Sequence, residues 1–135
     1  MTASAGYSGT PLAQKLGIKD GSTVALLGEP AGTVAPLPEG VTVKRQARGE
    51  ADVVVAFFTD RAAFGRRLAA LSEMIFPDGG LWVAWPKRSS GVTTTMDEHV
   101  VRELALPLGL VDNKVCAIDG TWSALRVVWR KERRR

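Results

Sequence analysis

The side chains best suited to binding an anion are concentrated in one loop. Two cations, five hydroxyl groups and a glycine occur between residues 87 and 95. The loop follows the apolar run Leu81–Trp85, so it is expected at the carboxyl end of a strand, where open α/β sheets bind ligands. The candidate anion contacts are Lys87, Arg88, Ser89, Ser90, Gly91 and Thr93. Alternatively, the hydroxyl groups only cap the following helix, because Thr95-x-x-Glu98 is a capping-box pattern.

A second candidate site follows the first predicted strand, Thr23–Leu27. The turn Gly28–Gly32 stands where a nucleotide-binding Rossmann domain has its glycine-rich turn. Pro30, Pro36 and Pro38 leave little room for a full crossover helix before the next strand, Val41–Lys44. The helix N-terminus that receives a phosphate is therefore expected to be missing or reduced to one turn.

The residues after Val41–Lys44 also depart from the dinucleotide-binding pattern. A ribose-binding acid is expected there, but Arg45 and Gln46 follow instead. The basic residues Lys44 and Arg45 could suit a phosphate, or this segment is simply a polar, exposed strand end. The secondary pocket candidates are Tyr7, Gly28, Arg45 and Trp85.

No group of residues predicts a catalytic or metal site. The single cysteine, Cys116, lies in an apolar stretch and is interpreted as a small buried hydrophobic residue. The single histidine, His99, falls on the polar side of a predicted helix whose buried stripe is Met96, Val100 and Leu104. We therefore predict no catalytic residue, no metal and no cofactor.

The elements that position these residues are organised around Ala51–Trp85. Val53–Phe58 is an unbroken apolar run typical of a strand buried on both faces. Asp60 is a predicted N-cap, and the helix after it buries one face, formed by Phe64, Leu68, Leu71 and Ile75. The turn 77–80 leads to the strand Leu81–Trp85, in which Trp82 and Trp85 should point to opposite faces. This is a βαβ unit with parallel strands.

The two ends of the chain complete the predicted fold. A short helix is expected with Thr10 as its N-cap and Pro11 as its first residue, and with Gly17 in the left-handed position that ends it. Asn113–Asp119 and Ser123–Trp129 are expected to form an antiparallel hairpin. The predicted fold class is therefore α/β: three layers, Rossmann-like, with a mostly parallel sheet and a C-terminal antiparallel hairpin.

Length, charge and composition predict the number of domains and the location of the protein. The 135 residues suffice for one domain, with residues 1–9 a flexible start and 130–135 a basic tail. The net charge is +4, and the tail could touch nucleic acid or anionic lipid, or could simply be a solvated terminus. No apolar run reaches membrane-spanning length and no signal peptide is evident, so a cytoplasmic protein is expected. The oligomeric state stays open.

Two short motifs carry a resemblance to a known family. Asp52-Val53-Val54 and Pro77–Leu81 resemble recurring motifs in the latter part of class I S-adenosylmethionine-dependent methyltransferases. The resemblance implies a methyltransferase-like Rossmann fold that lacks one strand–helix unit. The likeness ends where the cofactor would bind, because the glycine-rich turn is reduced to Gly28–Gly32 and the acid after the second strand is absent.

Nearly the whole chain also resembles a family of small actinobacterial proteins known only as a domain of unknown function. Gly6–Leu12, Leu81–Gly91 and Leu106–Asp119 carry that likeness, which implies no activity.

Three functional hypotheses follow, in this order. The first is a non-enzymatic module that binds a partner protein or a small anionic metabolite, because a fold can persist after its chemistry is lost. The second is binding of a phosphorylated ligand or a nucleic acid through Lys87, Arg88 and Arg45, with the basic tail. Exposed aromatic residues for stacking bases are not evident in the sequence. The third is a true methyltransferase.

Overall fold

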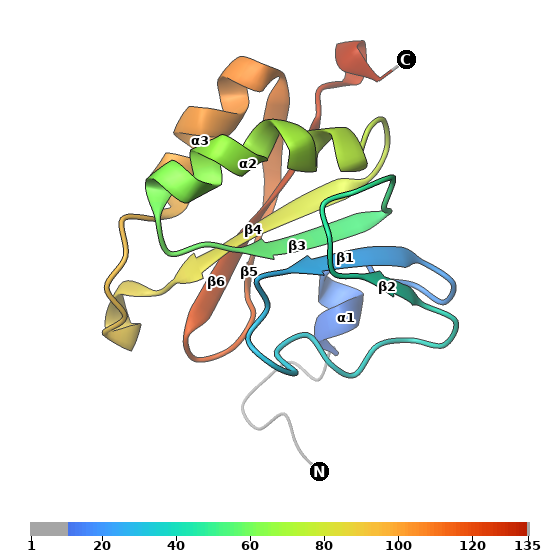
Figure 1. Ribbon diagram of the computed structural model, residues 1–135, viewed down its shortest axis with the longest axis horizontal. Coiled ribbons are helices and arrows are strands. Elements are labelled where there is room, and N and C mark those ends of the chain that lie inside the picture. The colour runs from blue at the N-terminus through green and yellow to red at the C-terminus, as the bar shows by residue number, and fades with distance from the viewer. Residues whose placement is uncertain (1–10, 135) are drawn as a thin grey trace.

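The computed structural model describes residues 11–134, which form one six-stranded sheet between two unequal layers (Figure 1). The strands are β1 (Thr23–Leu27), β2 (Thr42–Lys44), β3 (Val53–Phe57), β4 (Gly80–Pro86), β5 (Leu110–Ala117) and β6 (Trp122–Trp129). The helices are α1 (Leu12–Lys15), α2 (Arg61–Met74) and α3 (Glu98–Ala105), with 3-10 turns η1 (Arg88–Ser90), η2 (Leu106–Leu108) and η3 (Lys131–Arg133). The order β2-β1-β3-β4-β6-β5, with β6 antiparallel to both neighbours, confirms the predicted fold class.

Asp52 fixes the starting register of three strands. Its backbone N–H donates to the Thr23 carbonyl at 2.8 Å, and its Oδ2 accepts from the Thr23 N–H at 2.8 Å. Its carbonyl accepts from the Gly80 N–H at 3.0 Å. One residue therefore aligns the amino ends of β1, β3 and β4.

The crossover helix α2 forms as the sequence predicts. The Asp60 carboxylate accepts from the Ala63 N–H at 2.9 Å and so satisfies one of the free donors of the first turn. The predicted apolar face is buried against the sheet, at Phe64, Leu68, Leu71 and Ile75. The predicted βαβ unit is confirmed.

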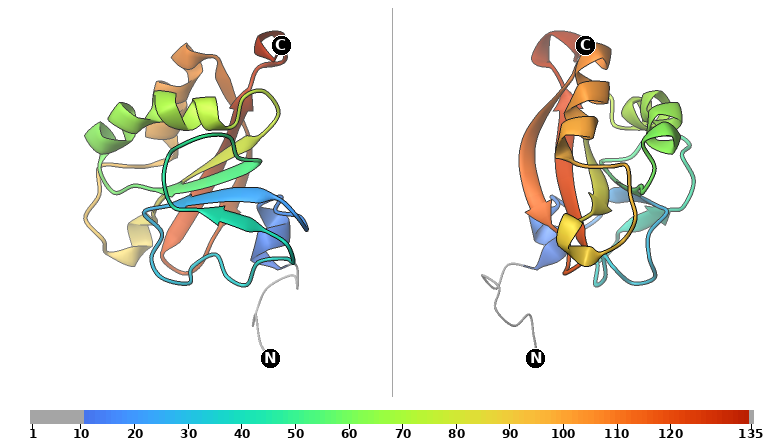
Figure 2. Two further views of the ribbon diagram at one scale, coloured as in Figure 1. Left: turned by 45° about the vertical axis from the view of Figure 1, so that its right-hand side comes forward. Right: turned by 90° about the vertical axis from the view of Figure 1, so that its left-hand side faces the viewer.

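The two faces of the sheet have different covers. Helices α2 and α3 pack on one face, whereas α1 and the segment around Val34 cover part of the other (Figure 2). Trp82 and Trp85 lie on opposite faces, as the spacing predicts, and both are buried. The Trp82 Nε1–H donates to the Leu16 carbonyl at 2.9 Å, and this bond holds α1 on the sheet.

The connection from β1 to β2 contains no helix and no strand, which confirms the prediction from its prolines. Val34, in the middle of this connection, is fully buried against the face that α1 covers. A coiled segment therefore replaces a crossover helix on this face of the sheet.

Several predicted boundaries shift. Strand β5 runs from Leu110 to Ala117 instead of Asn113–Asp119, with an irregularity between Asp112 and Lys114 that the apolar pattern does not reveal. Pro11 is the N-cap residue of α1 and not its first helical residue, while Gly17 has the expected positive φ of 82°. The predictions for Tyr7, Thr10, residues 1–9 and Arg135 lie outside the described residues. No helix within residues 11–134 is long and apolar enough to cross a membrane.

We predict that Gly79→Ala lowers the free energy of unfolding by about 1–3 kcal/mol, the usual cost of overpacking. A Cβ at Gly79 would lie 2.9 Å from both the Ala51 and the Asp52 carbonyl oxygens. These are backbone atoms, and the Asp52 carbonyl is held by its bond from the Gly80 N–H. The matched control is Gly120→Ala, where a Cβ meets nothing within 4 Å. Equal denaturation midpoints for the two variants would show that the turn before β4 tolerates a side chain.

Candidate functional site at the carboxyl edge of the sheet

A crevice lies at the carboxyl ends of β1 and β3. It encloses about 190 Å³ and is lined by Leu27, Gly28, Arg45, Phe57, Phe58 and Arg67. The chain leaves β1 for β2 on one side and returns to β3 on the other side, so the strand order reverses here. Open α/β sheets bind ligands at such a reversal. We call this hollow the switch-point crevice.

Gly28 brings the backbone unusually close to β3 in this crevice. Its φ of +70° is a conformation that glycine adopts freely, and a Cβ there would lie 3.1 Å from the Phe57 carbonyl oxygen. Any larger residue would strain the turn and fill the space beside Phe57. Gly28, a secondary candidate from the sequence, therefore lines the crevice and keeps it open.

A buried acid that the sequence analysis missed holds Arg45 at the mouth of the crevice. Glu29 Oε1 accepts from Arg45 Nη1 at 2.6 Å, and Glu29 Oε2 accepts from the Val34 N–H at 2.8 Å. The Glu29 side chain is 3% exposed, whereas that of Arg45 is 62% exposed. The sequence contains a signal for this pair. Glu29 follows β1 and Arg45 follows β2, and the carboxyl ends of neighbouring parallel strands meet at one edge of a sheet.

Lys44 has a structural role instead of a ligand-binding one. Its Nζ donates to the Glu50 carbonyl at 2.8 Å and to the Arg48 carbonyl at 3.2 Å, which closes the loop after β2. That loop borders a shallow hollow of about 480 Å³ next to the crevice, and Arg45 and Gln46 contribute to its lining.

A second and larger hollow lies at the carboxyl end of β4. It has a volume of about 800 Å³, and we call it the β4-edge pocket; its lining is Trp85–Arg88, Val92–Glu98 and Ser123. The predicted contacts Lys87, Arg88 and Thr93 belong to this lining. Ser89, Ser90 and Gly91 do not, because they form the turn η1 and its end. The Ser90 hydroxyl donates to the Lys87 carbonyl at 2.7 Å and accepts from the Val92 N–H at 3.1 Å.

The predicted capping box at Thr95 is wrong. Asp97 is the N-cap of α3, and its Oδ1 accepts from the Val100 N–H at 2.9 Å. Thr95 instead accepts from the Arg61 N–H at 2.7 Å, and the Thr94 hydroxyl donates to the Thr59 carbonyl at 2.7 Å. These bonds join the loop before α3 to the end of β3. The switch-point crevice, at β1 and β3, and the β4-edge pocket, at the neighbouring strand β4, lie along the same edge of the sheet.

The solved structures similar to this chain include several methyltransferases. A methyltransferase of Aquifex aeolicus described as SAM-dependent is 14% identical, with a TM-score of 0.61 over 84% of this chain and 85% of that one. Magnesium protoporphyrin IX methyltransferase of Synechocystis, with SAM bound, is 12% identical, with a TM-score of 0.59 over 82% and 71% of the two chains. The Methanococcus jannaschii fibrillarin pre-rRNA processing protein is 16% identical, with a TM-score of 0.56 over 89% and 69%. No protein-family model and no curated protein sequence matches the chain.

The chain has a methyltransferase-like Rossmann fold. The structural likeness to methyltransferases contradicts our first functional hypothesis, a non-enzymatic module. The methyltransferase hypothesis came last because the glycine-rich turn is reduced to Gly28–Gly32 and the acid after the second strand is absent. The reduced turn also lacks a helix N-terminus. That feature binds phosphate, and S-adenosylmethionine carries no phosphate group.

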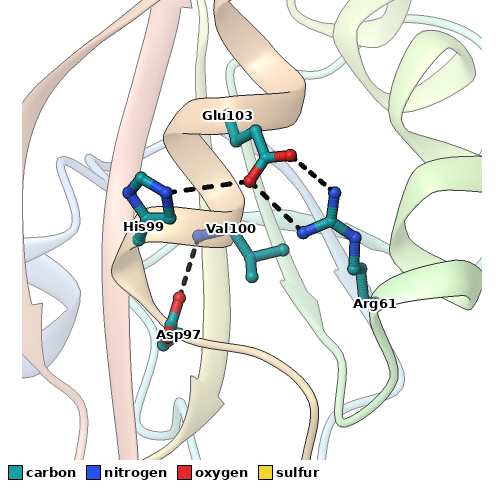
Figure 3. A network of polar contacts seen from close by, with 5 residues as sticks. All are labelled: Arg61, Asp97, His99, Val100 and Glu103. Atoms are coloured by element: carbon teal, nitrogen blue, oxygen red, sulfur yellow. Dashed lines mark hydrogen bonds and ion pairs between the residues drawn. The ribbon is translucent and has the colours of Figure 1, made fainter.

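Within this methyltransferase-like fold, a polar network joins α2 to α3 beside the β4-edge pocket (Figure 3). The Glu103 carboxylate accepts from Arg61 Nη2 at 2.7 Å and lies 3.7 Å from His99 Nε2. The His99 side chain is 83% exposed, which confirms the predicted surface position. The hydrogen bond from Arg61, followed by its positive charge, holds the pKa of Glu103 below its ordinary value.

Cys116 and His99 lie on different faces of the sheet and do not form a catalytic pair. Cys116 is half-buried on β5 and packs with the cluster that includes α1, whereas His99 belongs to α3 on the other side. Cys116 is less buried than the sequence predicts, because β5 is an edge strand. Burial raises the pKa of the Cys116 thiol, which disfavours the nucleophilic thiolate. No group of three or more His, Cys, Asp or Glu within residues 11–134 is arranged to hold a metal ion.

We predict that Glu29→Ala destabilises the protein by about 1–3 kcal/mol, because it leaves the Val34 N–H without its acceptor and removes the partner of Arg45. Glu39→Ala, at an exposed position in the same connection, is the control and should change the free energy of unfolding by less than about 0.5 kcal/mol. Urea denaturation measures both. A loss no larger than that of the control would show that Glu29 does not organise the crevice.

Stability should also fall in acid through Glu103. Its pKa is lowered in the folded state, so the contribution is present above the unfolded glutamate value of about 4.3 and is lost as the pH falls through the folded value. Glu103→Gln should therefore weaken the dependence of the urea midpoint on pH in this acidic range. A variant with the same acid dependence as the wild type would mean that the network in Figure 3 does not persist in solution.

Proposed function

We propose that this protein is a methyltransferase that binds S-adenosylmethionine in the switch-point crevice and holds an anionic methyl acceptor in the β4-edge pocket. The observation that carries the proposal is the placement of two adjoining hollows along the carboxyl edge of a methyltransferase-like sheet. Thr94 and Thr95, which line the β4-edge pocket, bond to the segment that follows β3, and β3 ends at the crevice.

The chemistry of the crevice fits the cofactor. S-adenosylmethionine presents an adenine ring, two ribose hydroxyls, a sulfonium cation, a carboxylate and an ammonium group. None of these groups requires the helix N-terminus that a pyrophosphate needs. The missing crossover helix therefore disfavours a dinucleotide as the ligand of the crevice. It does not disfavour a nucleoside ligand that has no phosphate.

The carboxylate, the ribose hydroxyls and the sulfonium of the cofactor each have a matching residue at the crevice or in the hollow beside it. Arg45 and Arg67 supply guanidinium groups for the carboxylate, and Gly28 allows the ligand to approach the backbone. Gln46, after β2, offers an amide oxygen to the ribose hydroxyls in place of the usual acid. The ring of Phe58 lines the crevice and suits the sulfonium cation.

The β4-edge pocket suits an anionic acceptor. The bound cofactor supplies an electrophilic methyl group, and the acceptor must be held with its nucleophilic atom in line with that group. Lys87 and Arg88 supply the positive charge that orients an anion there. The two carboxylates of the lining are already engaged, since Asp97 caps α3 and Glu98 pairs with Arg102.

We predict that S-adenosylhomocysteine, the product form of the cofactor, raises the melting temperature. At a hundred times its dissociation constant the stabilisation is about 2.7 kcal/mol, or on the order of ten degrees for a domain of this size. Arg67→Gln should weaken binding about tenfold, the loss of one charge-assisted hydrogen bond. The matched control is Arg66→Gln, a neighbouring exposed cation on α2 outside the crevice lining, which should bind like the wild type.

Methyl transfer is tested with S-adenosylmethionine that carries a tritiated methyl group and a small-molecule extract of the source cells. The Lys87→Gln/Arg88→Gln variant should keep its affinity for S-adenosylhomocysteine and lose most of the label transfer. No melting shift with either cofactor form at millimolar concentration would end the proposal. A melting-temperature shift without any methyl transfer would support cofactor binding but would contradict the assignment of the β4-edge pocket to the methyl acceptor.

A further inference from the structure

The lining of the β4-edge pocket contains apolar residues that a small anion would not use. Trp85, Pro86 and Met96 are buried residues that contribute to this lining, and Val92, which is 43% exposed, adds to it from the loop. We call these four residues the apolar lining. The pocket volume of about 800 Å³ falls in the range of about 300–1,000 Å³ that is typical of sites for organic ligands. A single inorganic anion would leave the apolar lining in contact with water.

The loop after β4 holds Val92 at this pocket. Gly91 ends the turn η1 with a φ of 80°, a left-handed conformation that favours glycine. The Val92 N–H then donates to the Ser90 hydroxyl at 3.1 Å, and that hydroxyl donates to the Lys87 carbonyl at 2.7 Å. Ser90 and Gly91, two of the predicted anion contacts, therefore position an apolar side chain at the pocket.

The same lining contains two cations that have no partner in the described part of the chain. Lys87 and Arg88 form no ion pair with the other residues between 11 and 134. The Lys87 N–H donates to the Thr121 carbonyl at 2.7 Å, so the backbone that carries this cation is held to the turn between β5 and β6. Unpaired positive charge and an apolar surface therefore line one pocket.

We propose that the β4-edge pocket selects organic acids that carry an apolar body, and that Val92 determines this specificity. The acid group pairs with Lys87 or Arg88, while the body covers the apolar lining. Ion pairs that are exposed to water contribute little affinity by themselves, so the apolar body supplies most of the discrimination. The inference rests on the proposed assignment of this pocket to the methyl acceptor, and it narrows that acceptor from any anion to an amphipathic acid.

The test is isothermal titration calorimetry of the protein without cofactor. The probes are naphthoate as an aromatic acid, octanoate as an aliphatic acid, and acetate and inorganic phosphate as anions without an apolar body. Naphthoate or octanoate should bind at least about tenfold more tightly than acetate or phosphate, since each methylene group removed from water contributes about a factor of four in affinity. The tighter of the two apolar acids identifies the body as aromatic or aliphatic.

Two valine variants locate the apolar contact. Val92→Thr should weaken binding of the tighter acid about fivefold and leave acetate unchanged, because a hydroxyl replaces a methyl group that the body covers. The matched control is Val115→Thr on β5, where the valine is 63% exposed and lies outside the pocket lining. This control should bind both apolar acids like the wild type.

Equal losses in the two valine variants would overturn the inference. Binding of acetate or phosphate within about threefold of the apolar acids would overturn it too, as would no detectable binding of either apolar acid at millimolar concentration. These outcomes are separable from the proposed function. A melting shift with S-adenosylhomocysteine but no preference for apolar acids would support the cofactor site and reject this specificity. A preference that Val92→Thr weakens, without any response to S-adenosylhomocysteine, would support the specificity of the pocket and reject methyl transfer.

Discussion

The three hydrogen bonds of Asp52 set the geometry on which the candidate site depends. They align the amino ends of β1, β3 and β4, and β1 and β3 are both five residues long. The two strands have equal lengths and β3 starts one residue later in register, so Gly28 comes level with Phe57 at the carboxyl edge. The crevice at the strand reversal is thus a consequence of register at the opposite edge of the sheet, where Gly79 must remain small because two backbone carbonyls face it.

The coiled connection between β1 and β2 limits which ligands fit the crevice. Without a helix N-terminus the protein lacks the amide cluster that binds phosphates in dinucleotide-binding domains. The segment instead contributes Val34 to the core and supplies, through the Val34 N–H, one of the two partners of Glu29. Glu29 in turn holds Arg45 at the mouth of the crevice. A guanidinium group therefore lies at the mouth of the crevice, where the proposed cofactor would place its carboxylate.

Sequence patterns predicted the sheet, the α2 crossover and the terminal hairpin, because apolar periodicity and turn residues act locally. They predicted less of the site, because site residues meet through tertiary contacts. Glu29 pairs with Arg45 across two strands, and Thr95 binds the start of α2 instead of capping α3. The predicted anion contacts in the loop after β4 have different roles for the same reason. Lys87, Arg88 and Thr93 line the β4-edge pocket, whereas the Ser90 hydroxyl bonds to the Lys87 carbonyl within the turn. Phe76 gains its partner Trp129 only after folding.

The central claim, that a nucleoside cofactor occupies the switch-point crevice, is tested most directly by nuclear magnetic resonance. Backbone amide shifts would be recorded while unlabelled S-adenosylhomocysteine is added to isotope-labelled protein. The account predicts that the largest shift changes occur at Gly28, Arg45, Gln46 and Phe58. Smaller changes should extend to Thr94 and Thr95, which bond to the segment after β3. Changes confined to the amino edge around Asp52 and Asp78, or no changes at saturating ligand, would contradict the account.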